Sequence, residues 1–125
     1  MKLNTLFIIT GIIGLFFGLL TLLIPGSFYS FYGGELTDHG KNAAQLQGAA
    51  YLGYAMLLFF ATRAKDLIAR RAIVIGLTIH FLIGLVVSLK LQLAGIVNAW
   101  GWSTVIIFLL LTLGYVYFLI KKSAD

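Results

Sequence analysis

Four long apolar stretches separated by short polar segments make up most of the chain. They cover about residues 3–24, 42–62, 72–93 and 99–120. Within each stretch the apolar residues are continuous and do not alternate with polar ones, which is typical of helices in lipid rather than of β-strands. Helices of about 20 residues, rising about 1.5 Å per residue, match a hydrocarbon core about 30 Å thick. The pattern predicts an all-α polytopic membrane protein with a bundle of four transmembrane helices.

The first apolar stretch ends at Pro25-Gly26, a pair that stops helices. It is longer than the core of about 7–15 residues in a signal peptide, and no A-x-A-like site follows it, so we expect a retained helix. The next segment, PGSFYSFYGGELTDHGK, is aromatic in its first half. We expect that half to form a short interfacial helix or turn that ends at Gly33-Gly34. We see no internal repeat and expect one domain over residues 1–125.

Composition supports lipid as the surrounding solvent. The 125 residues are 61% hydrophobic and 10% charged, against about 45–50% and about 25% in soluble domains. So small a body cannot hide that much apolar surface inside itself. The net charge of +5 resides on residues at the edges of the apolar stretches, which indicates membrane topology and not a nucleic-acid partner.

The basic residues predict an orientation. Seven of the nine Lys and Arg residues flank the two termini or the segment between the second and third stretches: Lys2, Arg63, Lys65, Arg70, Arg71, Lys121 and Lys122. The other two, Lys41 and Lys90, fall on the opposite side. An even number of spans puts the three basic segments on one side, which the positive-inside rule identifies as cytoplasmic. We therefore expect a multi-pass protein of the bacterial inner membrane with both termini in the cytoplasm.

Aromatic residues lie near both ends of the last stretch. Trp100 and Trp102 are at its outer end, and Tyr115 and Tyr117 approach its inner end. Amphipathic rings favour the headgroup zone. We expect these four side chains at the membrane surfaces.

Small residues recur four positions apart in three of the stretches. The glycines on these lines are Gly14, Gly18, Gly48, Gly53, Gly76 and Gly84. Lipid supplies no hydrophobic force between helices, so close packing and hydrogen bonds must hold them together. We expect these glycines to face the interior of the bundle or a partner subunit.

His80 lies on one of these lines, between Gly76 and Gly84. An ionisable side chain at mid-depth is costly against lipid and is expected to point inward. One interpretation is a hydrogen bond to Gln45, Gln47 or a Ser or Thr side chain. The other is a functional group: a proton carrier, a group that orients a ligand, or a metal ligand. We predict no metal site, because no second intramembrane His, Cys or carboxylate could complete one.

Three further residues join His80 as candidate ligand-binding groups. Gln45 and Gln47 carry amides that lipid cannot satisfy, and they either join helices or contact the polar head of a ligand. Lys90 is expected to extend its ammonium group to the headgroups, or alternatively to contact an anion.

Recognisable catalytic chemistry is missing from the sequence. We see no Asp or Glu within the apolar stretches, no G-x-S-x-G, no H-E-x-x-H and no phosphate-binding loop. We predict no catalytic residue and no cofactor, and a non-enzymatic role is favoured over an enzyme.

The layout resembles small bacterial four-span proteins of the DoxX-like kind. The similar elements are a first helix ending in LIPGSFYSFYGG, a glycine-rich second helix AAQLQGAAYLGYAMLL, a basic loop and an aromatic-edged last helix. One departure is Gln45-Leu46-Gln47, where a basic residue is expected. The resemblance implies a membrane subunit, and some members of that group are associated with quinone-linked oxidoreductases.

Three functional hypotheses remain. The leading one is a protein that acts by helix packing, as an oligomer or as an accessory subunit of a larger membrane complex. The second is a binder of a lipophilic small molecule (a quinone, an isoprenoid or a lipid) in a pocket between helices near His80. The third is an enzyme or proton-coupled carrier that uses His80. Under all three hypotheses, the expected partners of the protein are the lipid bilayer and either further copies of the same chain or other membrane subunits.

Overall fold

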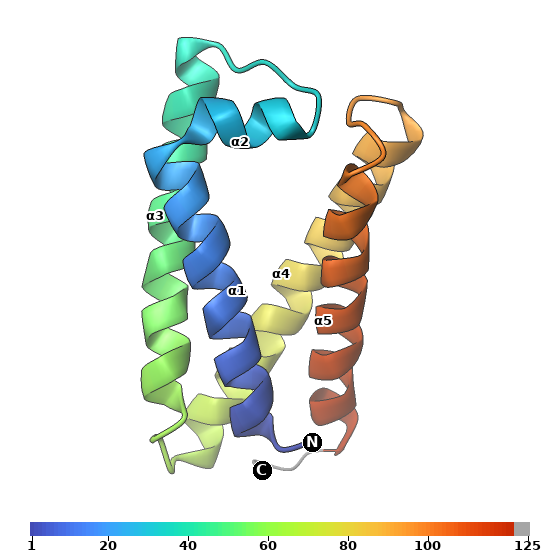
Figure 1. The fold of residues 1–125 in the computed structure, drawn as a ribbon. Coiled ribbons are helices and arrows are strands. Elements are labelled where there is room, and N and C mark those ends of the chain that lie inside the picture. Colours follow the sequence, from blue (N-terminus) through green and yellow to red (C-terminus); the bar gives the residue numbers. More distant parts are fainter. Residues whose placement is uncertain (122–125) are drawn as a thin grey trace.

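The computed structural model describes residues 1–121, which form five helices (Figure 1). These are α1 (Leu3–Leu23), α2 (Pro25–Phe31), α3 (Asp38–Ala61), α4 (Leu67–Leu93) and α5 (Gly101–Lys121). The predicted all-α class is confirmed. The short α2 occupies the segment for which a short helix or turn was expected, with Pro25 at its first position, where a proline needs no amide partner.

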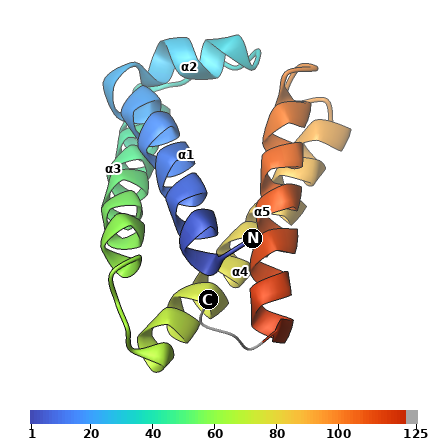
Figure 2. The ribbon, with the colours of Figure 1, turned by 60° about the horizontal axis from the view of Figure 1, so that its bottom comes forward.

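The four long helices are arranged as two pairs. α1 packs on α3, and α4 packs on α5. In Figures 1 and 2 the pairs diverge toward the end where α2 lies. We call this the α2 end; it also holds residues 94–100. The opposite, terminal end holds the start of α1, residues 62–66 and the end of α5 (Figure 1).

Three of the long helices, α1, α4 and α5, are long and apolar enough to cross a membrane. α3 has 24 residues, but its first turns are polar. Large apolar side chains such as Phe60, Val86 and Leu110 are exposed on the outside of the helices. Exposed apolar surface of this extent is suited to lipid and not to water. The helices therefore have the length and composition of a membrane protein, as predicted.

α4 begins at Leu67, earlier than the predicted start near Ala72. The cause is Asp66, whose carboxylate accepts hydrogen bonds from the backbone amides of Ile68 (3.3 Å) and Ala69 (3.2 Å) and caps the helix. Arg70 and Arg71 therefore lie within α4 and not in a loop. α3 likewise begins at Asp38 and not near Asn42, because the Thr37 hydroxyl caps its first turn.

The two arginines bond to backbone carbonyls at the terminal end. The buried Arg70 Nη1 donates to Ala61 O (3.0 Å), and the guanidinium lies 5.3 Å from the centre of the Phe7 ring. Arg71 Nη2 donates to Leu119 O (2.9 Å) in the last turn of α5. Cations at the carboxyl ends of helices satisfy carbonyls that have no partner within the helix.

The hydrophobic core lies at the terminal end, where the two pairs meet. Its buried members are Leu3, Leu6, Phe7, Leu58, Ala61, Val74, Phe81, Leu111, Tyr115 and Phe118. Tyr115 was expected in the headgroup zone, and that expectation is wrong: its side chain is fully buried. The ring can be buried because its hydroxyl donates to Thr10 Oγ1 (2.7 Å).

Three of the predicted packing glycines lie where α1 approaches α3. A Cβ added at Gly14 would lie 3.0 Å from the Tyr54 ring, and one at Gly18 would lie 3.1 Å from Leu52. A Cβ at Gly48 would lie 2.8 Å from Gly18 O, closer than such atoms pack. The absence of a side chain at Gly48 therefore allows the two backbones to approach.

The other three predicted packing glycines differ in their surroundings. Gly84 on α4 lies against the ring of Phe108 on α5, which a Cβ would overlap. In the part of the chain that the structure describes, a Cβ at Gly53 or Gly76 would meet no neighbouring atom within 4 Å. These two glycines therefore have no close neighbour among residues 1–121.

Candidate functional site

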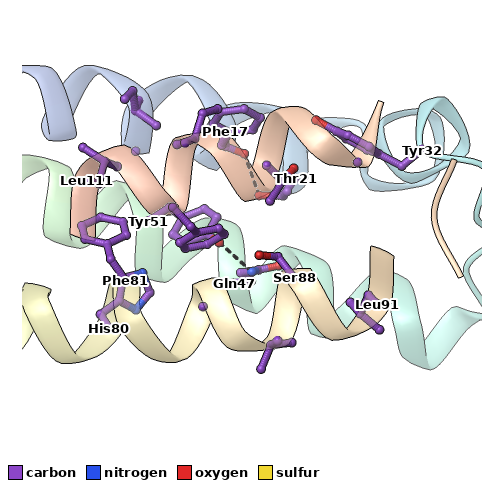
Figure 3. Close-up of a pocket in the computed structure, with 18 of the residues that line it drawn as sticks. Phe17, Thr21, Tyr32, Gln47, Tyr51, His80, Phe81, Ser88, Leu91 and Leu111 are labelled. Carbon is purple, nitrogen blue, oxygen red and sulfur yellow. Dashed lines mark hydrogen bonds between the residues drawn. The ribbon is translucent and has the colours of Figure 1, made fainter. Parts of the chain in front are cut away.

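A cavity of about 490 Å³ lies between the two helix pairs, on the α2 side of the core (Figure 3). All five helices contribute to it. Its lining residues are Ile13, Gly14, Phe17, Thr21, Phe28, Tyr29, Tyr32, Gln47, Tyr51, Tyr54, His80, Phe81, Ile83, Gly84, Val87, Ser88, Leu91, Val97, Gly101, Thr104, Ile107, Phe108 and Leu111. Phe81 and Leu111 also belong to the core, so the core forms the floor of the cavity.

The walls of this interhelical cavity are mainly apolar and aromatic. Among residues 1–121, no Asp, Glu, Lys or Arg side chain lines it. A few hydroxyl, amide and imidazole groups supply its polarity. Its volume lies within the range of about 300–1,000 Å³ typical of small-molecule sites, which combine apolar walls with a few polar groups.

One cluster of polar side chains joins α2 to α3 in the part of the cavity wall nearest the α2 end. The Tyr29 hydroxyl donates to Gln47 Oε1 (2.9 Å). Gln47 Nε2 in turn donates to the Tyr51 hydroxyl (2.7 Å; Figure 3). Burial, together with the nearby Tyr32, raises the pKa of Tyr29, so its phenol keeps the proton that it donates. The cluster fixes α2 across the α1–α3 pair and largely satisfies its own polar groups.

His80 lies at the midpoint of α4 and lines the cavity (Figure 3). Its ring centre is 5.7 Å from that of Tyr54, 4.8 Å from Phe81 and 6.3 Å from Phe108. The hydrogen bond expected from His80 to Gln45, Gln47 or a Ser or Thr is not formed among the described residues. The Tyr54 hydroxyl also has no hydrogen-bond partner in residues 1–121. His80 and Tyr54 therefore line the cavity from opposite helix pairs, and neither side chain has a hydrogen-bond partner among the described residues.

The structure brings together only two of the four predicted ligand-binding residues. His80 and Gln47 line the cavity, and Gln45 and Lys90 do not. Gln45 is two positions from Gln47, so it points to another face of α3, where its Nε2 donates to Leu22 O (3.2 Å). Lys90 is exposed on α4 outside the cavity. The assignment of Gln45 and Lys90 to a common site with His80 is therefore not supported by their positions.

Sequence reasoning missed the tyrosines of the cavity. Tyr51 follows Gln47 by one helical turn, and that spacing could have suggested their contact. Tyr54 lies one further turn along the same wall. Tyr29 reaches the cavity from α2, and no spacing along the sequence indicates that α2 folds back over α3.

The α2 end of the cavity is bridged by Asn98 in the connection between α4 and α5. Its backbone amide donates to Tyr32 O (3.0 Å), and its Nδ2 donates to Phe31 O (2.9 Å). Trp100 adds a ring contact with Phe31, at 5.2 Å between ring centres. We call these contacts the Asn98 bridge. It links the two helix pairs at the end where they otherwise diverge.

No group of three or more metal-ligating side chains is found among residues 1–121. No protein-family model, no curated protein and no solved structure matches the chain. The resemblance to DoxX-like proteins stays a prediction. Function is inferred from the cavity and the helices.

Proposed function

We propose that this protein crosses the bacterial inner membrane four times and binds a lipophilic small molecule in the interhelical cavity. The observation that carries the proposal is His80: a histidine at the midpoint of a long apolar helix lines a cavity and has no hydrogen-bond partner among residues 1–121. Ionisable side chains at membrane depth are expensive and mark functional sites.

Four crossings are supported by hydrogen bonds that hold α3 against α1 at both ends of this helix pair. Asn4 Nδ2 donates to Thr62 O (3.1 Å) at one end of this pair, and Gln45 Nε2 donates to Leu22 O (3.2 Å) at the other. From Gln45 to its end, α3 therefore runs antiparallel to α1 and covers nearly the whole length of that apolar helix. A helix held along a spanning neighbour in this way crosses with it, and its polar first turns then lie at the membrane surface.

The orientation is supported by charge. Six of the basic residues lie at or near the terminal end: Lys2, Arg63, Lys65, Arg70, Arg71 and Lys121. Lys122 lies outside the described residues, and Lys41 and Lys90 lie toward the α2 end. By the positive-inside rule the terminal end, with both chain termini, faces the cytoplasm.

Ligand binding is supported by the chemistry of the lining. Phe17, Phe28 and Phe108 offer ring surfaces to an apolar body, and unpaired polar groups are available to a head. The ligand classes compatible with such a lining are a quinone, an isoprenoid and a lipid.

The test is mass spectrometry of small molecules that co-purify with the protein from native membranes in mild detergent. We expect one enriched lipophilic species, which is reduced in His80→Ala and lost in Val87→Phe, since Val87 lines the cavity. Val86→Phe is the matched control, because the neighbouring Val86 is exposed and does not line the cavity. Retention of no species by the wild-type protein, or equal retention by the two valine variants, would overturn the proposal.

Assembly with a second subunit is a further candidate, favoured by Gly53 and Gly76. Both were predicted to pack, and both face open space in the described chain. We expect Gly53→Leu and Gly76→Leu to preserve the fold and to weaken association. Native mass spectrometry or cross-linking in membranes measures this association. A wild-type protein that is monomeric and has no bound partner would contradict assembly with a second subunit.

A further inference from the structure

We propose that the ligand of the interhelical cavity is an uncharged amphiphile whose hydroxyl or carbonyl head is held between His80 and Tyr54. This inference rests on the proposed function and narrows it to one chemical class. The apolar chain of the ligand then extends away from the core floor, along the wall of α4.

Because no charged side chain lines the cavity among the described residues, we expect the head of the ligand to be uncharged. Among residues 1–121 the cavity wall contains no acidic or basic side chain. The nearby Arg70 and Arg71 direct guanidinium groups to backbone carbonyls at the terminal end and not into the cavity. A charged head would enter apolar surroundings without a counter-charge, which is far more costly than burial of a neutral polar group.

Two side chains without hydrogen-bond partners among the described residues, Tyr54 and His80, indicate that the head of the ligand forms hydrogen bonds. The Tyr54 hydroxyl on α3 and the His80 imidazole on α4 belong to rings whose centres are 5.7 Å apart. A phenol can donate and accept, and a neutral imidazole has one donor and one acceptor nitrogen. The rings are in edge contact, so a hydroxyl or a carbonyl that reaches both groups from the cavity would satisfy them, whereas a purely apolar molecule would leave them unpaired at a cost.

The position of this pair fixes the direction of the ligand. Phe81 and Leu111 close the cavity toward the terminal end, directly beside His80 (Figure 3). From His80 toward the α2 end, α4 presents the apolar Ile83, Val87 and Leu91 to the cavity. The wall from His80 to Leu91 is about 16 Å long at the helical rise per residue. It accommodates an alkyl or prenyl chain.

The test compares five C16 probes on the purified, delipidated full-length chain in mild detergent. They are 1-hexadecanol, 2-hexadecanone, hexadecane, hexadecanoate and hexadecyltrimethylammonium, and native mass spectrometry or calorimetry measures their affinities. We expect the alcohol or the ketone to bind about tenfold more tightly than hexadecane, which corresponds to roughly one net hydrogen bond in an apolar site. The ratio between alcohol and ketone distinguishes a hydroxyl from a carbonyl head. Both ionic probes should bind no more tightly than hexadecane.

Variants connect the preference to the two residues. Tyr54→Phe and His80→Ala should each reduce the ratio of the affinity for the neutral polar probe to that for hexadecane several-fold. Tyr117→Phe is the matched control, because this tyrosine is exposed on α5 and lies outside the cavity. Circular dichroism establishes that each variant retains its helices.

The outcomes separate this inference from the proposed function. Equal affinity for hexadecane and the neutral polar probes, or tightest binding of an ionic probe, overturns the inference and leaves the binding function standing. If no probe binds and no native species co-purifies, the proposed function falls and the inference falls with it. A preference for the alcohol or ketone that both cavity variants abolish supports the pair as the head site.

Discussion

Tyr115 on α5 donates a hydrogen bond of 2.7 Å to the hydroxyl of Thr10 on α1, which in turn donates to Leu6 O at 2.8 Å. Tyr115 is also stacked on Phe7, at 6.4 Å between ring centres, and on Phe81, at 5.7 Å. These contacts connect one helix pair to the other directly below the cavity. The site therefore depends on a buried contact whose central residues, Tyr115, Thr10 and Phe7, do not line the cavity.

Tyr115→Phe removes the hydrogen bond but keeps the stacked ring. We expect a loss of about 1 kcal/mol in the free energy of unfolding, the usual net value of one such bond. Thermal unfolding in detergent measures the loss. Tyr117→Phe, at an exposed phenol of the same helix, should leave the midpoint unchanged; equal midpoints for the two variants and the wild type would contradict the role of the Tyr115 hydroxyl.

Gly48→Ala places a methyl group within 2.8 Å of Gly18 O and Leu22 N, both backbone atoms of α1. The two helices must move apart, and we expect a destabilisation of about 1–3 kcal/mol, as for other overpacked sites. Gly53→Ala is the matched control on the same helix, where the added methyl group meets no neighbour. It should be neutral or slightly stabilising, because alanine favours a helix by up to about 1 kcal/mol over glycine. Equal thermal stability of the two variants would argue against close α1–α3 packing.

Sidedness can be measured directly because the chain contains no cysteine. We expect a membrane-impermeant maleimide added to spheroplasts to label Glu35→Cys, at an exposed position near the α2 end. It should not label Lys65→Cys, at an exposed position in the α3–α4 connection, until the membrane is opened. The reverse labelling pattern would invert the proposed orientation, and labelling of both sites from outside would exclude four crossings.

Asn98→Ala removes the side-chain half of the Asn98 bridge, the 2.9 Å bond to Phe31 O. Because this bridge links the helix pairs beside the cavity, we expect a several-fold faster dissociation of a bound probe with little change in thermal stability. A stopped-flow chase with excess unlabelled probe measures the rate. Gln45→Ala is a suitable comparison, since it removes a bond within the α1–α3 pair and none across the cavity. An unchanged rate in Asn98→Ala would show that the bridge does not limit exit.

The sequence predicted the helices well because their signal is local. Continuous apolar stretches and the Pro25-Gly26 break are properties of neighbouring residues, and the structure has helices in these places. The start of α4 was placed too late, because the two arginines suggested a solvated loop. The Asp66 cap and the bonds of Arg70 and Arg71 to carbonyls allow helix there instead.

The site was predicted less completely because it depends on relations between distant segments. His80 and Gln47 were identified as polar residues in apolar surroundings, a local signal. The contributions of Tyr54 and Tyr29 depend on which helices pair and where the pairs diverge, and one sequence carries no direct record of that. Tyr115 was assigned to the membrane surface because its internal partner, Thr10, lies 105 positions away.

In the proposed orientation, Arg70 and Arg71 have two roles with different requirements: they add positive charge to the cytoplasmic side, and they bond to backbone carbonyls. The orientation of a membrane protein depends on the number of positive charges on each side, so lysines at these positions would have the same effect on orientation. Arg71, however, reaches two consecutive carbonyls of α5, at Phe118 and Leu119, and Arg70 spans the α3 terminus while lying on the ring of Phe7. A planar, forked cation meets these demands and a point charge does not. In the proposed orientation, Arg71 thus adds to the positive charge of the cytoplasmic side and also fastens the final helix to α4.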